Sequence, residues 1–244
     1  MSAGVRQGGV LSPDFYGIYV DKLIGILKKA GFGCHVRGIF AATLFYADDM
    51  AVLAPSVKGL QNILHLCSNY CQEWDIMLNP KKTRNLYFGK GGPPKHSVCI
   101  NGTLIPWVDS WKYLGVTLKS GDKFSCCIKE KLCSFYRALN SIIRIDGRPD
   151  EMVLLQLLEA HCLPILTYGV EIIYVANRDD RRQLRVAYNS IFRNLFHYSY
   201  NESVTELQHA LHRPTWEELL ERRNEKFSLK LESEPELCWS AQIL

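Results

Sequence analysis

Apolar residues recur at intervals of three and four over residues 12–29, which predicts an amphipathic helix. Ser12 suits the N-cap position because its hydroxyl can accept a hydrogen bond from the first turn, and Pro13 suits the first helical position. Gly31 follows the last apolar residue and is expected to end the helix.

After this helix the pattern changes to two short apolar runs at residues 41–45 and 50–54. Short runs of this kind, bounded by turn-forming residues, are typical of β-strands. They flank residues 46–49, whose sequence is Tyr-Ala-Asp-Asp. The pattern therefore predicts a buried β-hairpin with an acidic tip.

Local signals further along the chain predict elements whose character changes near residue 119. Asn101-Gly102 is typical of a two-residue hairpin turn, and Thr215 with Glu218 matches a helix capping box. The predicted elements are a helix at 56–77, strands at 86–88, 98–100, 103–105 and 111–118, and helices at 124–145, at 150–176 with a break at Pro164, at 179–196 and from 215 onward. A mixed region followed by a helical one predicts an α+β fold with a domain boundary near 119.

Charge is distributed unevenly along the 244 residues, although the formal net charge is only +4. Residues 202–236 contain nine acidic and five basic residues, so the preceding part of the chain is basic. Residues 76–108 contain no acidic residue and five basic ones. A basic body is typical of a polyanion-binding protein, and a solvated basic face is the commoner alternative.

The nine cysteines are odd in number and scattered, with no pair spaced for a zinc module. Buried thiols in a reducing, intracellular compartment are expected, with nucleus and cytoplasm both left open. The chain shows neither a secretory leader pattern nor an apolar run long enough for a membrane span, so membrane association is not expected.

Asp48 and Asp49 are the first candidates for chemistry, because two adjacent carboxylates at a hairpin tip are accessible to a hard cation. Mg²⁺ prefers oxygen ligands and is commonly held by one or two carboxylates together with substrate phosphates. The alternative is a plain turn, since aspartate hydrogen-bonds its own backbone in turns.

A second candidate is residues 4–13, where two glycines stand beside an arginine and a glutamine ahead of the predicted helix. Glycines let the backbone approach a ligand closely, and the polar side chains can contact a phosphate or a base. Taken alone, this segment could equally be a flexible loop.

These segments together resemble the reverse transcriptases, specifically those of non-LTR, LINE-type, retrotransposons. Four segments follow the family's order. Residues 6–13 resemble its motif B, 45–49 its motif C, 78–83 its motif D and 111–115 its motif E. A looser similarity covers the helical stretch from residue 119 onward.

The resemblance implies the C-terminal part of a polymerase palm, an antiparallel sheet with packed helices, followed by an all-helical thumb-like domain. The expected domains are a palm with motifs B to E at 1–118, a thumb-like domain at 119–201 and an acidic helical segment at 202–244. The implied partners are an RNA template with a DNA primer, or an RNA–DNA hybrid, and a deoxynucleoside triphosphate.

The resemblance also implies roles for individual residues. Asp48, supported by Asp49, would bind catalytic Mg²⁺, and Lys82 would approach the triphosphate as a general acid or as a neutralising charge. The motif B residues would lie beside the incoming nucleotide and the template base; they are Arg6, Gln7, Gly8 and Gly9. The motif E residues would form the primer grip; they are Trp111, Lys112, Tyr113, Leu114 and Gly115.

One departure from the family pattern bears on activity. The two-metal site of these polymerases also uses an aspartate on a strand before motif B, and this sequence begins at motif B. The chain alone is therefore expected to be inactive, and its sheet to have an open edge through which it could associate. The alternatives are a non-catalytic nucleic-acid-binding remnant and a decayed open reading frame.

Overall fold

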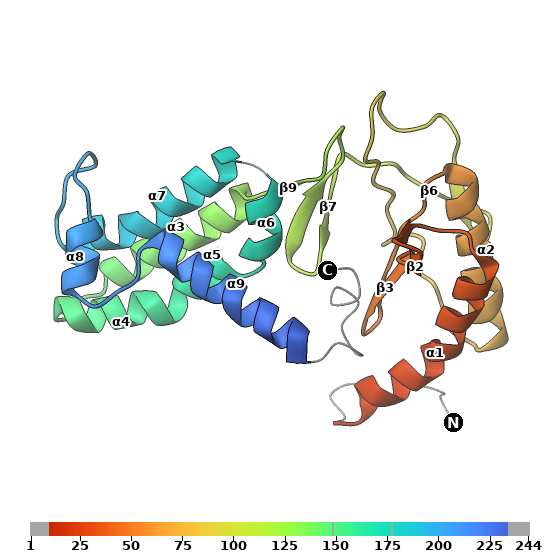
Figure 1. Cartoon of the computed structure of the whole chain (residues 1–244), viewed down its shortest axis with the longest axis horizontal. Helices are drawn as coiled ribbons and strands as arrows, with labels where there is room; N and C mark the ends of the chain where they lie inside the picture. The colour runs from red at the N-terminus through yellow and green to blue at the C-terminus, as the bar shows by residue number, and fades with distance from the viewer. Residues whose placement is uncertain (1–9, 148, 177, 234–244) are drawn as a thin grey trace. The chain divides into compact units, whose positions relative to one another are not determined.

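A computed structural model describes residues 10–147, 149–176 and 178–233 (Figure 1). Within this part of the chain the residues group into two compact units. The first unit contains residues up to 87 together with 91–108, and the second contains residues 88–90 and those from 109 onward.

The first unit begins with helix α1 (Ser12–Ala30), close to the predicted span. Leu11 occupies the N-cap position and no side chain caps the helix, so the prediction of Ser12 as N-cap is wrong by one position. Gly31 ends the helix as predicted, since its φ of +69° is the left-handed conformation that glycine adopts without strain.

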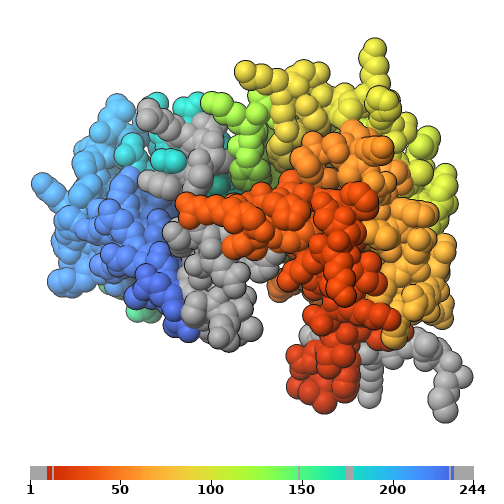
Figure 2. Space-filling model, turned by 45° about the vertical axis from the view of Figure 1, so that its right-hand side comes forward, coloured from red at the N-terminus to blue at the C-terminus, as the bar shows by residue number. Residues whose placement is uncertain are grey.

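Helix α2 (Val57–Glu73) packs beside α1, and both lie at the surface of this unit (Figures 1 and 2). The Tyr70 hydroxyl donates to the carbonyl of Tyr19 at 2.6 Å, and the Tyr19 hydroxyl donates to the carbonyl of Trp74 at 2.9 Å. The Tyr19 and Trp74 rings also meet edge to face at 5.1 Å. These contacts fix the position of α1 on α2.

Helix α2 is shorter than the predicted 56–77. Ser56 is its N-cap, and its hydroxyl accepts a hydrogen bond from the Gly59 amide at 3.1 Å. The helix ends at Glu73 because Asp75, with a φ of +55°, turns the chain out of the helical conformation.

The strands of the first unit form three antiparallel pairs, each a two-stranded sheet. They are β1 (His35–Val36) with β2 (Ile39–Phe40), β3 (Thr43–Tyr46) with β4 (Asp49–Val52), and β5 (Val98–Ile100) with β6 (Thr103–Ile105). The predicted Asn101-Gly102 hairpin is confirmed, with both turn residues at positive φ. The predicted strand at 86–88 is wrong, since residues 85 and 88 make only isolated bridges.

The second unit begins with a three-stranded antiparallel sheet of β7 (Ser110–Tyr113), β8 (Val116–Lys119) and β9 (Ser125–Cys127). The predicted single strand at 111–118 is therefore wrong, because the chain reverses between β7 and β8. The predicted helix at 124–145 also begins later than expected, because residues 125–127 pair with β8 before α3 (Lys129–Ile143) starts.

Except for α8, which was not predicted, the other helices of this unit agree with the predicted spans more closely. The predicted helix at 150–176 is interrupted around Pro164, as expected, and divides into three short helices. The helices are α4 (Glu151–His161), α5 (Leu163–Thr167), α6 (Val170–Ala176), α7 (Arg178–Leu195), α8 (Thr205–Ala210) and α9 (Trp216–Ser233).

The capping box at the start of α9 is confirmed. The Thr215 amide donates to the Glu218 carboxylate at 2.9 Å, and the Glu218 amide donates to the Thr215 hydroxyl at 3.3 Å. The hydrogen bond from Thr215 holds the pKa of Glu218 below its usual value.

The core of the second unit joins the sheet to the helices. Phe135 of α3, Leu155 of α4 and Ile191 of α7 are fully buried in it, together with Val116 of β8 and Cys126 of β9. Each large apolar side chain buried in this way contributes about 1.5–3 kcal/mol. The described part of this unit is thus not all-helical, because it buries strands and helices in one core.

The fold is mixed helix with small antiparallel sheets, in agreement with the predicted α+β class. The domain assignment of 1–118, 119–201 and 202–244 stays a prediction. No helix among the described residues has the length and apolar character needed to cross a membrane. The eight cysteines in the described ranges are free thiols, and burial raises the pKa of Cys67 to about 12.

One edge of the β5–β6 pair is covered by a side chain of α2. The Gln61 amide donates to the carbonyl of Cys99 at 2.9 Å and accepts from the Cys99 amide at the same distance. Gln61 thereby makes the two hydrogen bonds that a neighbouring strand would make at this position. Association through an open sheet edge stays a prediction, and it does not apply to the edge at Cys99.

Replacing Gln61 by alanine is expected to destabilise the first unit by roughly 1–3 kcal/mol, because it leaves both backbone groups of Cys99 without their partner. Urea unfolding followed by circular dichroism measures this loss. Gln72→Ala, at an exposed position of the same helix, is the matched control and should have little effect. Equal stability of the two variants would contradict the role assigned to Gln61.

Candidate functional site

The acidic hairpin, strands β3 and β4 with their turn, has the predicted register. Tyr46 pairs with Asp49, so Ala47 and Asp48 form a two-residue turn. Residues 46–49 are all exposed. The strands are only partly buried, with Leu44 47% exposed, so the prediction of a buried hairpin is wrong while its acidic tip is confirmed.

The turn has a conformation that its sequence does not favour. Ala47 has a φ of +50°, in the left-handed region that costs a residue with a Cβ about 1–2 kcal/mol. A two-residue hairpin turn requires positive φ at its first residue, and Arg37, Asn101 and Leu114 occupy the same position in the other hairpins. The turn leaves both carboxylates exposed to solvent.

Helix α1 contributes a tyrosine to the surroundings of the acidic hairpin. Burial raises the pKa of Tyr16, and the nearby groups Cys71 and Asp48 raise it further because their negative forms disfavour a phenolate. Asp48 therefore lies within electrostatic range of the Tyr16 hydroxyl. Sequence reasoning did not single out Tyr16, since its position in α1 gives no local signal.

The two carboxylates could supply part of a cation's ligand set. Aspartate oxygens suit Mg²⁺, and the exposed tip leaves room for water and phosphate oxygens to complete the shell. Among the described residues, no cluster of three or more histidine, cysteine, aspartate or glutamate side chains is arranged to hold a metal ion. The two carboxylates therefore suit a hard cation whose other ligands are oxygens of a second group, such as a phosphate.

The predicted motif D segment, residues 78–83, forms a tight turn after α2. The Asn79 side chain accepts from the Lys82 amide at 3.2 Å, and the Thr83 hydroxyl donates to the Asn79 carbonyl at 2.9 Å. Leu78 packs against the core around Val98 and Ile100. The turn is thus anchored while Lys82 is exposed.

Arg84 strengthens the same turn from its C-terminal side. Its guanidinium donates to the carbonyls of Lys81 and Thr83 at 2.7 and 2.6 Å. Lys81 and Lys82 therefore stand on a turn with many internal hydrogen bonds. Among the described residues, no ion pair joins Lys82 to Asp48 or Asp49.

The predicted motif E segment forms strand β7 and the turn into β8, within the second unit. Trp111 is 38% exposed, and the Lys112 ammonium lies 4.0 Å from the Glu130 carboxylate with both side chains largely exposed. Tyr113 pairs with Val116 across a two-residue turn formed by Leu114 and Gly115.

The predicted site residues are thus divided between the units. Asp48, Asp49 and Lys82 lie in the first unit and residues 111–115 in the second. The predicted motif B residues Arg6, Gln7, Gly8 and Gly9 lie outside the described residues.

Comparison with known proteins identifies the segment that carries these features. Residues 1–118 match the family model described as Reverse transcriptase (RNA-dependent DNA polymerase). This segment belongs to the reverse transcriptase family.

The similarity to curated relatives extends beyond the reverse transcriptase segment, over most of the chain. The chain is 28% identical over 242 residues to the "Probable RNA-directed DNA polymerase from transposon BS" of Drosophila melanogaster, covering 95% of this chain and 26% of that protein. It is 23% identical over 244 residues to the RNA-directed DNA polymerase from mobile element jockey of the same species, covering 96% of this chain and 26% of that protein.

A third relative is the Pol polyprotein of the type-1 retrotransposable element R2 from Popillia japonica. It is 28% identical over 177 residues, which cover 69% of this chain and 28% of that protein. The reverse transcriptase segment is therefore of the non-LTR, LINE-type class. The chain spans about a quarter of the length of these curated relatives.

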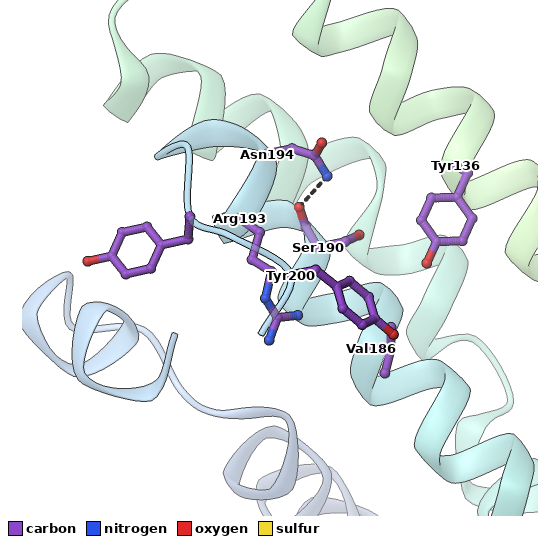
Figure 3. Close-up of a pocket in the computed structure, with 7 residues that line it drawn as sticks. Tyr136, Val186, Ser190, Arg193, Asn194 and Tyr200 are labelled. Atoms are coloured by element: carbon purple, nitrogen blue, oxygen red, sulfur yellow. Dashed lines mark hydrogen bonds between the residues drawn. The ribbon is translucent and has the colours of Figure 1, made fainter. Parts of the chain in front are cut away.

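The second unit contains a pocket of about 220 Å³ between α3, α7 and the loop after α7 (Figure 3). The Arg193 guanidinium donates to the carbonyl of Glu202, and the Asn194 amide donates to that of Ser190. The Arg193 guanidinium also lies 5.8 Å from the centre of the Tyr200 ring. The two contacts of Arg193 fasten the loop to α7, while the Asn194 bond lies within the helix, so the pocket is explained by the packing of the unit.

Sequence reasoning also missed the turn within the predicted motif E segment, residues 111–115. A glycine at residue 115 between two short apolar runs is a recognisable hairpin signal. Leu114 ahead of it obscured that signal, because leucine rarely adopts the positive φ, here +44°, that this turn requires.

Two substitutions of Ala47, in the turn of the acidic hairpin, are expected to differ in stability because the residue there has positive φ. Ala47→Gly should remain within about 1 kcal/mol of the parent, since relief of strain offsets the entropy that glycine loses on folding. Ala47→Val should cost roughly 1–3 kcal/mol, because a β-branched residue is poorly suited to positive φ. Urea unfolding measures both.

Ala51→Val is the matched control for this comparison. Ala51 lies in strand β4 opposite Leu44, where valine is favoured, so it should be tolerated. Indistinguishable stabilities of the glycine and valine variants at residue 47 would show that the turn does not have this backbone in solution.

Proposed function

We propose that this chain supplies motifs B to E of an RNA-directed DNA polymerase of the LINE-type class, with Asp48 and Asp49 as its metal-binding residues. The observation that carries this is the acidic hairpin, which exposes Asp48 in its two-residue turn and Asp49 at the start of β4, within the segment that matches the family. A plain turn would also accommodate two aspartates, and the positive φ of Ala47 follows from the two-residue hairpin turn itself. The metal-binding role is therefore supported by the place of the pair within the segment that matches the family.

Asp48 would be the principal ligand of Mg²⁺, and Asp49 a weaker or supporting one. When bound, divalent ions in such sites activate the attacking hydroxyl and stabilise the leaving oxygens of an in-line displacement. The hairpin itself holds the two carboxylates in fixed positions. Their negative charge is therefore preorganised and needs no rearrangement during the reaction.

Lys82 would interact with the triphosphate of the incoming nucleotide. Its backbone is held by the Asn79 side chain, while its ammonium group is exposed. A lysine on a fixed turn can neutralise a phosphate or donate a proton to the leaving group, and both uses require only that the triphosphate come within reach.

The finer division into palm and thumb is part of the same proposal. Residues 1–118 would form the C-terminal part of the palm and residues 119–201 the thumb, followed by the acidic segment at 202–244. Residues 111–115 would contact the primer, and the support for this is their match to motif E together with the exposure of Trp111 and Lys112.

The partners follow from the proposed function. The transposon BS and jockey relatives are described as RNA-directed DNA polymerases. By analogy, this chain would handle an RNA template, a DNA primer and a deoxynucleoside triphosphate, and residues Arg6, Gln7, Gly8 and Gly9 would lie beside the nucleotide.

A second candidate function is nucleic-acid binding without catalysis. It is favoured by the absence of a cluster of three or more metal-ligand side chains among the described residues and by the acid-free basic stretch at 76–108. Metal binding separates the two functions, because the chain alone is not expected to extend a primer. Mn²⁺ binding that is lost in Asp48→Asn supports the polymerase segment, and hybrid binding without a metal site at Asp48 supports the second candidate.

Binding of an RNA–DNA hybrid is expected to depend on Lys81 and Lys82. Both are exposed on the motif D turn, and each phosphate contact contributes about −0.9 to the slope of log K against log salt on duplex DNA. Lys81→Ala with Lys82→Ala should weaken binding and reduce the slope by about 1–2. Fluorescence anisotropy over a range of salt concentrations measures both quantities.

The matched control replaces Lys226 and Lys230, two exposed lysines of α9 that stand among acidic residues. It removes the same charge and should change binding little. Arg84 is left in place because its guanidinium holds the turn itself. If the two double variants have the same affinity and slope, the basic stretch is only a solvated face.

A further inference from the structure

The motif E turn is attached to the helical part of its own unit by a tyrosine from a distant segment. The Tyr168 hydroxyl donates to the carbonyl of Leu114 at 2.8 Å. Its ring lies so close to Gly115 that a Cβ added there would stand 2.9 Å from the ring edge. Glycine is thus required at residue 115 both by its φ of +78° and by the tyrosine beside it.

Tyr168 is itself held by Lys131 of α3. The Lys131 ammonium donates to the carbonyls of Ile165 and Tyr168, both at 2.8 Å, and lies 5.7 Å from the centre of the Tyr168 ring. Ile165 lies in α5 and Tyr168 directly follows that helix, so the charge also stabilises carbonyls at the negative end of a helix.

A further contact fixes the residue after the tyrosine. Gly169 has a φ of +62°, and a Cβ added there would stand 3.0 Å from a methyl group of Val116. Val116 begins strand β8 and is buried in the core of the unit. The segment Tyr168-Gly169 therefore closes over the motif E turn and the strand that follows it.

The charge of Lys131 is balanced within the same unit. Burial lowers the pKa of Lys131, and the carboxylate of Glu171 opposes this shift. Glu171 also accepts from the Arg223 guanidinium of α9 at 2.8 Å. The support of the turn thus continues from Tyr168 into helices α3, α6 and α9.

We propose that Tyr168, held by Lys131, is a positioning residue that fixes the motif E turn so that the exposed Trp111 and Lys112 meet the 3′ end of the primer in a defined place. The inference rests on the proposed function. A rigid support matters because a shift of about 1 Å in the reacting ends can cost roughly a hundredfold in rate. Tyr168 needs no contact with the primer to have this effect.

The first test is independent of nucleic acid and compares Tyr168→Phe with the parent by hydrogen exchange. Phenylalanine keeps the ring and its place over Gly115 but removes the hydrogen bond to Leu114. Amides of residues 113–117 should exchange roughly 2- to 10-fold faster, the effect expected from one hydrogen bond, while α4 and α7 keep their protection. Unchanged exchange in the turn would overturn the inference.

The second test places 2-aminopurine at the primer 3′ end of an RNA–DNA hybrid and follows its fluorescence on binding. Tyr168→Phe should keep the dissociation constant within about twofold, since phosphate contacts supply the affinity, but reduce the fluorescence change at the 3′ end. Lys131→Met should reproduce this loss, and Lys131→Arg should restore part of it. Tyr136→Phe, an exposed tyrosine of α3, is the control.

The two tests separate this inference from the proposed function. If the parent chain does not bind the hybrid, the proposed function fails, and hydrogen exchange still decides whether Tyr168 holds the turn. If the turn loosens in Tyr168→Phe while the signal at the 3′ end is unchanged in a bound hybrid, Tyr168 shapes the protein but does not position the primer, and the inference is wrong.

Discussion

Two tight turns with left-handed backbone carry the candidate chemistry, and their conformations depend on support from the rest of each unit. Ala47 at the acidic hairpin and Leu114 at the motif E turn both have a Cβ and both adopt positive φ. Such residues cost free energy that the surrounding structure must offset. The packing around each turn therefore bears directly on whether its side chains are in place for function.

The two units support their turns in different ways. In the first unit, backbone hydrogen bonds hold the base of the acidic hairpin: the Leu53 amide donates to the Ala42 carbonyl, and the Cys34 amide donates to the Leu53 carbonyl. In the second unit, the Tyr168 hydroxyl holds the motif E turn through its hydrogen bond to Leu114. Val116, directly after the turn, is buried in the core that contains Phe135. The reverse transcriptase segment thus ends in strands whose stability comes from the helices that follow it.

Where local chemistry decides the structure, sequence patterns predicted it well. Gly31 ends α1, Asn101-Gly102 forms a hairpin turn, and Thr215 with Glu218 forms a capping box, because each depends on residues close in the chain. The roles given to Asp48, Asp49 and Lys82 came from their resemblance to motifs C and D, and the structure adds that all three are exposed, in or directly beside tight turns. Predictions failed where distant contacts decide. Leu114 is held in its turn by Tyr168, and Cys126 forms a strand because it pairs with Leu118 rather than continuing the helix after it.

The central claim is that the acidic hairpin binds a divalent cation through Asp48 and Asp49. Electron paramagnetic resonance of Mn²⁺ tests it most directly, because bound and free Mn²⁺ have different signals and no catalytic activity is needed. We expect the parent chain to bind Mn²⁺, Asp49→Asn to bind it more weakly and Asp48→Asn not to bind it at this site. Asp122→Asn, at an exposed aspartate of the second unit, is the control and should bind like the parent. Equal Mn²⁺ binding by the parent and Asp48→Asn would contradict it.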